Sequence, residues 1–229
     1  HSPQAGHQGS NFPFGSFASW NTSAFALDGA TAGSVQISMG AGDLTVRGGA
    51  SDGYIMESTV TSPSPEWQPG YFQSADGSTM TVTMTDHGKT GKDWLPGDSK
   101  NVWDVVLTTE VPLALDVDHG AGDCTLSLGT LKLSGLSIDS GAGETTVDLR
   151  GYRGGAFSGR INQGVGDLCV LVQKNSNTRI VVDQGIGDIH DNGFVKARHE
   201  YSTPGFDPAA PVTAILVDQG IGDIRLEAV

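Results

Sequence analysis

Basic side chains are scarce in this sequence. Lys and Arg number 13 against 26 Asp and Glu, which gives a formal net charge of −13 over 229 residues. Nucleic acids and anionic membrane surfaces select the opposite balance, so the sequence predicts neither as a partner. It also lacks an apolar run of the roughly 18 residues that a membrane-spanning helix needs. We therefore expect no membrane span in this chain.

Cysteine and aromatic residues are also rare. Cys124 and Cys169 lack metal-site spacing, and the repeat described below places them two repeats apart on opposite faces, which predicts free thiols. Aromatic residues make up 7% and charged residues 17% of the chain, whereas its 33 glycines are about twice the usual share. This composition favours short strands and tight turns over helices or disorder.

A motif built around Gly-X-Gly occurs six times. Its copies span residues 38–46, 118–126, 139–147, 162–170, 183–191 and 218–226, and the last two share the identical heptad DQGIGDI. Four consecutive copies, from 118–126 to 183–191, are separated by 21, 23 and 21 residues, which is typical of a coil of stacked, equal turns. We call each strand–corner–strand copy a rung. The pattern predicts an all-β fold, a single-chain parallel β-solenoid with GxGD corners every 21–23 residues.

The columns of the aligned copies alternate between apolar and polar residues. The columns three residues before the first glycine, and four and six after it, are largely apolar, as strands with one buried face require. Asp191 breaks the last of these columns. Both glycines are expected to permit positive φ and close approach between rungs. The residue between them is expected to face inward as a corner filler; it is Ala41, Ala121, Ala142, Val165, Ile186 or Ile221.

The chain divides into three parts of one continuous domain. Residues 1–33 form an aromatic, Gly/Ser-rich N-terminal arm, and residues 34–117 hold the first rung and an antiparallel β excursion. Residues 118–229 form the regular rungs, with a loop or hairpin insertion at 190–212. The last rung is expected to end the stack, with an exposed edge.

Two acidic columns flank every corner. The entry row, two residues before the first glycine, is Ser38, Asp118, Asp139, Asn162, Asp183 and Asp218; the exit row, three residues after it, is Asp43, Asp123, Glu144, Asp167, Asp188 and Asp223. Carboxylates about 4.8 Å apart repel, so something must offset this. Backbone N–H groups of the glycine turn would do so, and the sequence favours this explanation. The alternative is a row of shared Ca²⁺ ions, bound by the acidic residues of both rows other than Asp43.

The N-terminal arm is the strongest sequence indication of self-association. Its aromatic residues are Phe12, Phe14, Phe17, Trp20 and Phe25. They are expected either to cap the chain's own stack or to cover the exposed terminal rung of a second copy. Asn21 begins an Asn-Thr-Ser sequon, a candidate glycosylation site.

The corners GAGD, GAGE, GVGD and GIGD, with the segment WDVVLTTEVPLALDVDHGAGDCTLSL, resemble the bacterial toast-rack and "putative adhesin" domain families. They are similar also to the C-terminal domain of cell-wall-active antibiotic response proteins. The resemblance covers about residues 34–229. It implies a β-solenoid and a protein of the cell envelope or surface, mostly without a defined biochemical activity.

The expected function is therefore non-catalytic. No CxxC pair, phosphate-binding loop or nucleophile elbow occurs, and carboxylates that recur on every rung do not mark one active site. We predict an extracellular or cell-surface, adhesin-like structural protein that partners with itself, as an oligomer or filament, or with cell-envelope or glycan components. The alternative is a carbohydrate-binding or polysaccharide-cleaving β-helix protein, with its site at the acidic corner or at residues 190–212.

Overall fold

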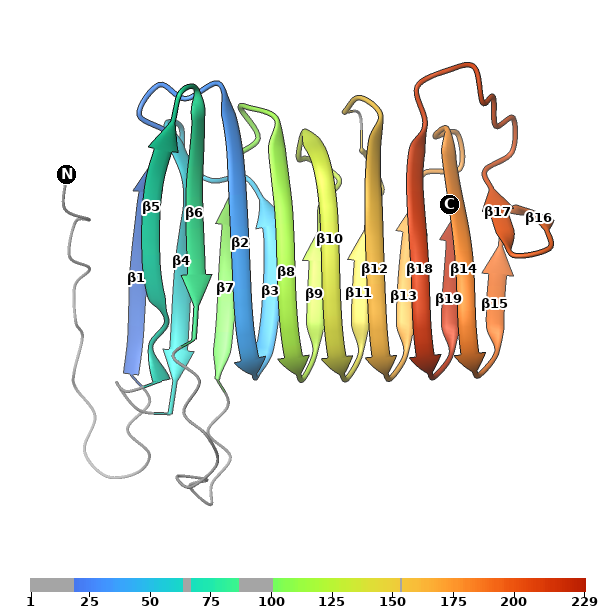
Figure 1. Ribbon diagram of the computed structural model, residues 1–229, viewed down its shortest axis with the longest axis horizontal. Coiled ribbons are helices and arrows are strands. Elements are labelled where there is room, and N and C mark those ends of the chain that lie inside the picture. The colour runs from blue at the N-terminus through green and yellow to red at the C-terminus, as the bar shows by residue number, and fades with distance from the viewer. Residues whose placement is uncertain (1–18, 64–66, 87–100, 153) are drawn as a thin grey trace.

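The computed structural model describes residues 19–63, 67–86, 101–152 and 154–229 (Figure 1). In these ranges the chain is all-β, and two sheets lie against each other along one long axis. The first sheet has the order β1 (Ser19–Ala26), β4 (Tyr54–Ser62), β7 (Val102–Leu107), β3 (Asp43–Gly48), β9 (Cys124–Ser127), β11 (Thr145–Asp148), β13 (Leu168–Val172), β19 (Ile224–Ala228), β15 (Ile189–Asn192). The second has the order β16 (Val195–Ala197), β17 (Glu200–Ser202), β14 (Thr178–Ile186), β18 (Thr213–Ile221), β12 (Phe157–Val165), β10 (Leu133–Ala142), β8 (Leu113–Ala121), β2 (Ala32–Ala41), β6 (Thr79–Thr85), β5 (Gly70–Asp76). Within these ranges no helix is long and apolar enough to cross a membrane.

Each motif copy contributes one strand to each sheet, joined at its glycine corner. β8, β10 and β12 pair in parallel, with Ile138 opposite Val117 on one side and Ile161 on the other. β9, β11 and β13 pair in parallel in the other sheet. Residues 21–23 apart in sequence are therefore neighbours in space, as the spacing predicts.

The core lies between the two sheets and is built from the apolar columns. Val117, Ile138 and Ile161 are fully buried, and so are Val147 and Val170 across from them. Alternate residues of each strand face outward, as in the burial of β10. The predicted period of two therefore sets the core up to the corner.

The described residues between 47 and 117 extend both sheets rather than loop out from the stack. β4 pairs antiparallel with β1 and β7, and β5 pairs antiparallel with β6. However, β6 runs parallel to β2, and β7 runs parallel to β3. The expected antiparallel pairs are present, but they sit on an additional parallel layer that the glycine motif does not mark.

The last two rungs are stacked in the reverse of their sequence order. β18 lies between β12 and β14, and β19 lies between β13 and β15. The prediction that the C-terminal rung is the exposed end of the stack is therefore wrong. The insertion at 190–212 contains the β16–β17 hairpin, which pairs antiparallel with β14 and covers that edge.

Asp191 supplies a physical reason for this order. Asp191 lies opposite Leu226, in a column whose members are buried in the inner rungs. Leu226 is fully buried, whereas Asp191, on the last strand of its sheet, is exposed. Placing β15 inside the stack would bury an unpaired carboxylate, which is far more costly than burying a leucine. A charge in the core-facing column of an edge strand also hinders pairing with another chain.

The aromatic residues of the N-terminal arm differ in burial where the structure describes them. Phe25 is 3% exposed and packs on Tyr71, with ring centroids 5.0 Å apart, so it belongs to the chain's own core and not to a self-association surface. Trp20 is 45% exposed, and Asn21 lies partly exposed on β1; Phe12, Phe14 and Phe17 fall outside the described residues. Both cysteines are free, as predicted, and burial raises the pKa of Cys124 to about 12.

Candidate binding edge at the glycine corners

The glycine corners form one continuous edge of the molecule. A Cβ on Gly141 would lie 2.3 Å from the carbonyl oxygen of Gly120, and one on Gly143 would lie 1.9 Å from that of Gly122. Gly143 also has a φ of +130°, which side-chain-bearing residues rarely adopt. Close approach thus requires glycine at both positions and positive φ requires it at the second.

In the copies that carry glutamine, the residue before the corner binds a glycine carbonyl of a neighbouring rung. Gln163 Nε2 donates to the Gly143 carbonyl at 2.8 Å, and Gln184 Nε2 donates to the Gly222 carbonyl at 2.7 Å. These amides therefore hold glycine carbonyls and do not bond to one another as a ladder.

His119 takes the same place in its rung, with Nε2 2.9 Å from the Gly42 carbonyl. It is fully buried, and its Nδ1 has no partner among the described residues. Sequence reasoning missed this role, although the shared column with the glutamines carried the signal.

The residue between the two glycines faces solvent, contrary to prediction. Val165 is 52%, Ile221 49% and Ile186 68% exposed, and the three alanines of the column are exposed too. In β8, β10 and β12 the alternation of buried and exposed residues stops at the first glycine of the corner, so that this glycine and the residue after it are both exposed. The positive-φ glycine that follows then turns the chain into the next sheet.

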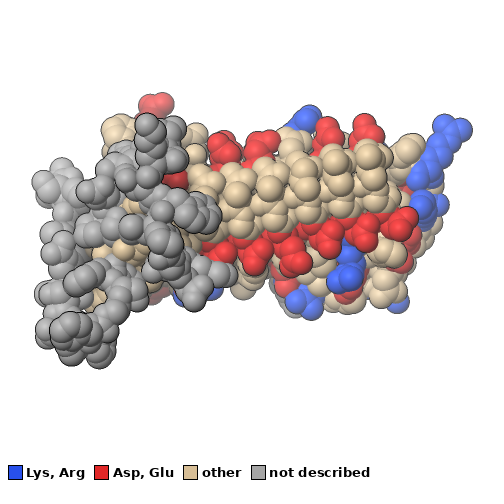
Figure 2. Space-filling view, turned by 90° about the horizontal axis from the view of Figure 1, so that it is seen from below, with Lys and Arg blue, Asp and Glu red and all other residues tan. Residues whose placement is uncertain are grey.

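In spatial order these residues form what we call the corner ridge: Ala41, Ala121, Ala142, Val165, Ile221 and Ile186. Figure 2 shows this edge as an uncharged band with carboxylates along both borders. The borders are the entry and exit rows. The acidic members of both rows are exposed, apart from Asp43, which is half-buried.

Part of the exit row is held by backbone donors. The N–H of Asp223 donates to Asp167 Oδ1 at 3.0 Å, and the N–H of Asp188 donates to Asp223 Oδ1 at 2.9 Å. The donors at these two carboxylates are backbone N–H groups, as the favoured explanation expects, but they belong to the exit-row aspartates of the neighbouring rung and not to the glycines. Nowhere in the described ranges do three or more His, Cys, Asp or Glu side chains converge as a metal site would require.

The entry row is less well compensated. Asn162 Nδ2 donates to Asp139 Oδ1 at 2.5 Å. This amide stands among the carboxylates of the entry row and offsets the negative charge of one of them. Nearby, partial desolvation raises the pKa of Asp116 above its ordinary value, and the Asp139 and Asp118 carboxylates raise it further. The entry side of the corner therefore concentrates negative charge.

Two hollows lie on this side. One, of about 440 Å³, follows the corners between the entry row and the ridge. Its walls include Asp118, Asp139 and Asp218, and its floor includes Gly120 and Gly141, which have no side chains to fill it.

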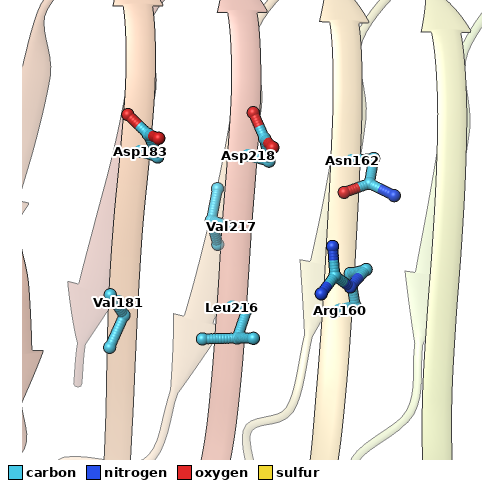
Figure 3. Close-up of a pocket in the computed structure, with 7 residues that line it drawn as sticks. All are labelled: Arg160, Asn162, Val181, Asp183, Leu216, Val217 and Asp218. Atoms are coloured by element: carbon cyan, nitrogen blue, oxygen red, sulfur yellow. The ribbon is translucent and has the colours of Figure 1, made fainter.

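The second hollow, of about 180 Å³, lies on the outer face of β12, β18 and β14 (Figure 3). Asp183 and Asp218 stand side by side there, and Arg160 lies level with Leu216. No aromatic side chain lines it.

Comparisons with known proteins show the fold and the family. No curated protein matches the chain. A solved structure called a "putative cell adhesion protein" from Clostridium sporogenes is similar over 93% of this chain and 100% of its own, with a TM-score of 0.88 and 19% identity. A "putative adhesin" from Bacteroides fragilis is similar over 90% and 96%, with a TM-score of 0.32 and 9% identity. The family model described as the N-terminal domain of toast_rack, DUF2154, matches residues 15–171, more than half of the chain, and the chain therefore belongs to the toast-rack family.

Proposed function

We propose that this protein is a non-catalytic, adhesin-like binding module of the cell surface or extracellular space, and that it binds a macromolecular partner along the corner ridge. One observation carries the proposal: large apolar side chains lie exposed in a line on a rigid edge, between two borders of carboxylates. Exposed apolar patches of this kind are typical of interaction sites. The name of the Clostridium structure, a "putative cell adhesion protein", is in accord with this function.

The rigidity of the edge supports a binding role. Every corner is packed against its neighbour through backbone atoms, and its preceding side chain holds the neighbouring rung in the copies that carry Gln or His. A surface that is ordered before binding loses little conformational entropy when a partner docks. The repeat also lets several weak contacts act together.

The carbohydrate alternative has less support. Sugar sites use exposed aromatic rings as platforms, but Tyr201 in the 190–212 segment is 1% exposed and is packed edge-on by Phe194 at 6.5 Å. The hollow in Figure 3 is open and has no aromatic lining. The carboxylates of the edge recur at even spacing rather than as one pair in a cleft.

The test is adhesion of protein-coated beads to bacterial or host cells. We expect the wild type to adhere and the ridge variant V165S/I221S/I186S to lose adhesion. The matched control, F72S/V195S/L216S, removes three other exposed apolar side chains, which are 64%, 58% and 47% exposed, and should adhere like the wild type. Equal adhesion of all three proteins, or turnover of polysaccharide by the wild type, would refute the proposal.

A further inference from the structure

We infer that the partner of the corner ridge is a protein that presents a basic amphipathic helix, an inference that rests on the function proposed above. The partner's apolar stripe would lie on the ridge, and Lys or Arg on both sides of that stripe would meet the two rows.

The apolar part of the site is concentrated at one end of the ridge. Val165, Ile221 and Ile186 occupy three consecutive rungs, those of β12, β18 and β14, whereas the other three rungs carry alanine. Branched side chains that are half to two-thirds exposed on a rigid edge contribute little to the core. They are the anchor positions of the site.

Charge complementarity selects a basic partner. The carboxylates beside these three rungs are Asp218 and Asp183 in the entry row and Asp167, Asp223 and Asp188 in the exit row. None of the five forms an ion pair with Lys or Arg within the described ranges. A second copy of this chain, with its own net charge of −13, would bring like charges together, as would an anionic membrane.

The spacing of the ridge favours a helix over an extended strand. Adjacent rungs are about 4.8 Å apart, so three rungs span about 9.6 Å. One face of a helix repeats about every 5.4 Å and covers about 10.8 Å in two turns. Alternate side chains of a strand are about 6.8 Å apart and cover about 13.6 Å, which misses the third rung by about 4 Å. Apolar residues at i, i+4 and i+7 can therefore meet the three anchors.

The glycine floor gives the basic side chains room. The hollow of about 440 Å³ runs along the corners toward Asp218, with Gly164 in its lining. Long aliphatic stems of Lys or Arg can lie over such a surface while their charged ends reach carboxylates. A small cation would use the carboxylates but not the ridge.

The probe is a synthetic helical peptide with Leu at i, i+4 and i+7 and Lys at every flanking position. Three control peptides separate the contributions of charge, apolar contact and helical spacing. The first has Glu in place of Lys, the second has Ser in place of Leu, and the third has the same composition with Leu and Lys alternating. We expect the full-length protein to bind the first peptide at least tenfold more tightly than each control in fluorescence anisotropy. Binding should weaken with salt, because exposed charge pairs are screened within a Debye length of about 10 Å at 0.1 M.

Two charge variants decide whether the rows act locally. D183N/D218N/D188N removes three carboxylates beside the anchors, and its binding should weaken by about tenfold, as expected for three exposed ion pairs. D28N/D52N/D76N removes the same charge from exposed positions away from the corners, and its binding should change by less than about twofold because of screening. Equal weakening of both variants would mean that only net charge matters and would overturn the inference.

Other outcomes are equally decisive. Equal binding of the Lys and Glu peptides, or of the helical and alternating peptides, would overturn the basic helix. Ridge-dependent binding to zwitterionic phosphatidylcholine vesicles would assign the ridge to a membrane surface instead. If the ridge variant loses bead adhesion but the peptide does not bind, the proposed function stands and this inference fails; if the ridge variant adheres normally, the proposed function fails first.

Discussion

Alanine at Gly143 tests whether the corners are packed as the structure has them. Its Cβ would lie 1.9 Å from the Gly122 carbonyl oxygen, at a φ of +130°. Because the contact is with backbone, relief requires the rungs to separate. That weakens the hydrogen bonds that join these two rungs at the corner: the one from Gly122 N–H to the Ala142 carbonyl, 2.9 Å long, and the one from Cys124 N–H to the Glu144 carbonyl, 2.8 Å long. We expect a loss of roughly 4 kcal/mol in the free energy of unfolding, at the upper end for single substitutions.

Two other glycines separate the contributions to this loss. Gly151 has a φ of +80° with nothing within 4 Å of the added Cβ, so G151A should cost only the positive-φ strain, about 1–2 kcal/mol. Gly135 has no positive φ and an open Cβ position, so G135A should be neutral or stabilise by up to about 1 kcal/mol. Urea unfolding followed by circular dichroism gives all three values. If G143A costs no more than G151A, the close stacking of the corners is wrong.

Three further predictions follow from the charges. D116N should raise the free energy of unfolding at pH 7, because the fold raises the pKa of Asp116 and so penalises its ionised form. The gain should disappear at pH values below the ordinary carboxyl range, where wild-type Asp116 is protonated in both the folded and the unfolded state. An equal gain at both pH values would contradict this. D191L should leave the monomer stable but promote self-association in light scattering, because it removes the charge from the core-facing column of the edge strand, whereas L226D should cost roughly 4 kcal/mol by burying an unpaired carboxylate. Excess EDTA should leave the melting temperature unchanged; a fall on chelation that calcium restores would revive the shared-cation explanation.

The repeat predicts much of the fold because its columns report two separate physical demands. Apolar residues on alternate positions place Ile138 next to Val117 and Ile161 in the core, and paired glycines place the corners in contact. Both demands act between adjacent rungs, so a spacing of 21–23 residues was enough to predict them. The layer formed by β6 and β7 lacks the glycine corner, so no repeated motif indicates its register in advance.

The order of the last two rungs could not be predicted from the motif. The heptad DQGIGDI is identical in both, so either rung satisfies the corner of its neighbour equally well. The difference lies outside the heptad, where Asp191 stands opposite Leu226. In the sequence Asp191 is only an irregularity in an apolar column, and the burial of Asp191 and Leu226 in the structure shows that it marks the end of the stack.

The acidic rows of the candidate site could be predicted from the sequence, but the exposed apolar ridge between them could not. If the alternation of buried and exposed residues is extended through the corner, Val165, Ile186 and Ile221 are predicted to face inward. The prediction is wrong because the strand period does not continue through a corner that ends in a positive-φ glycine. The backbone of the glycines and the inward Gln or His satisfy the structural demands of the turn. The turn does not require side chains of any particular type at most of the exposed positions beside them, although Asp167 and Asp223 accept backbone N–H groups. Carboxylates about 4.8 Å apart repel by roughly 1 kcal/mol per neighbouring pair in water. An exposed apolar ridge between rows of carboxylates that the fold uses only in part is best explained by what binds to it.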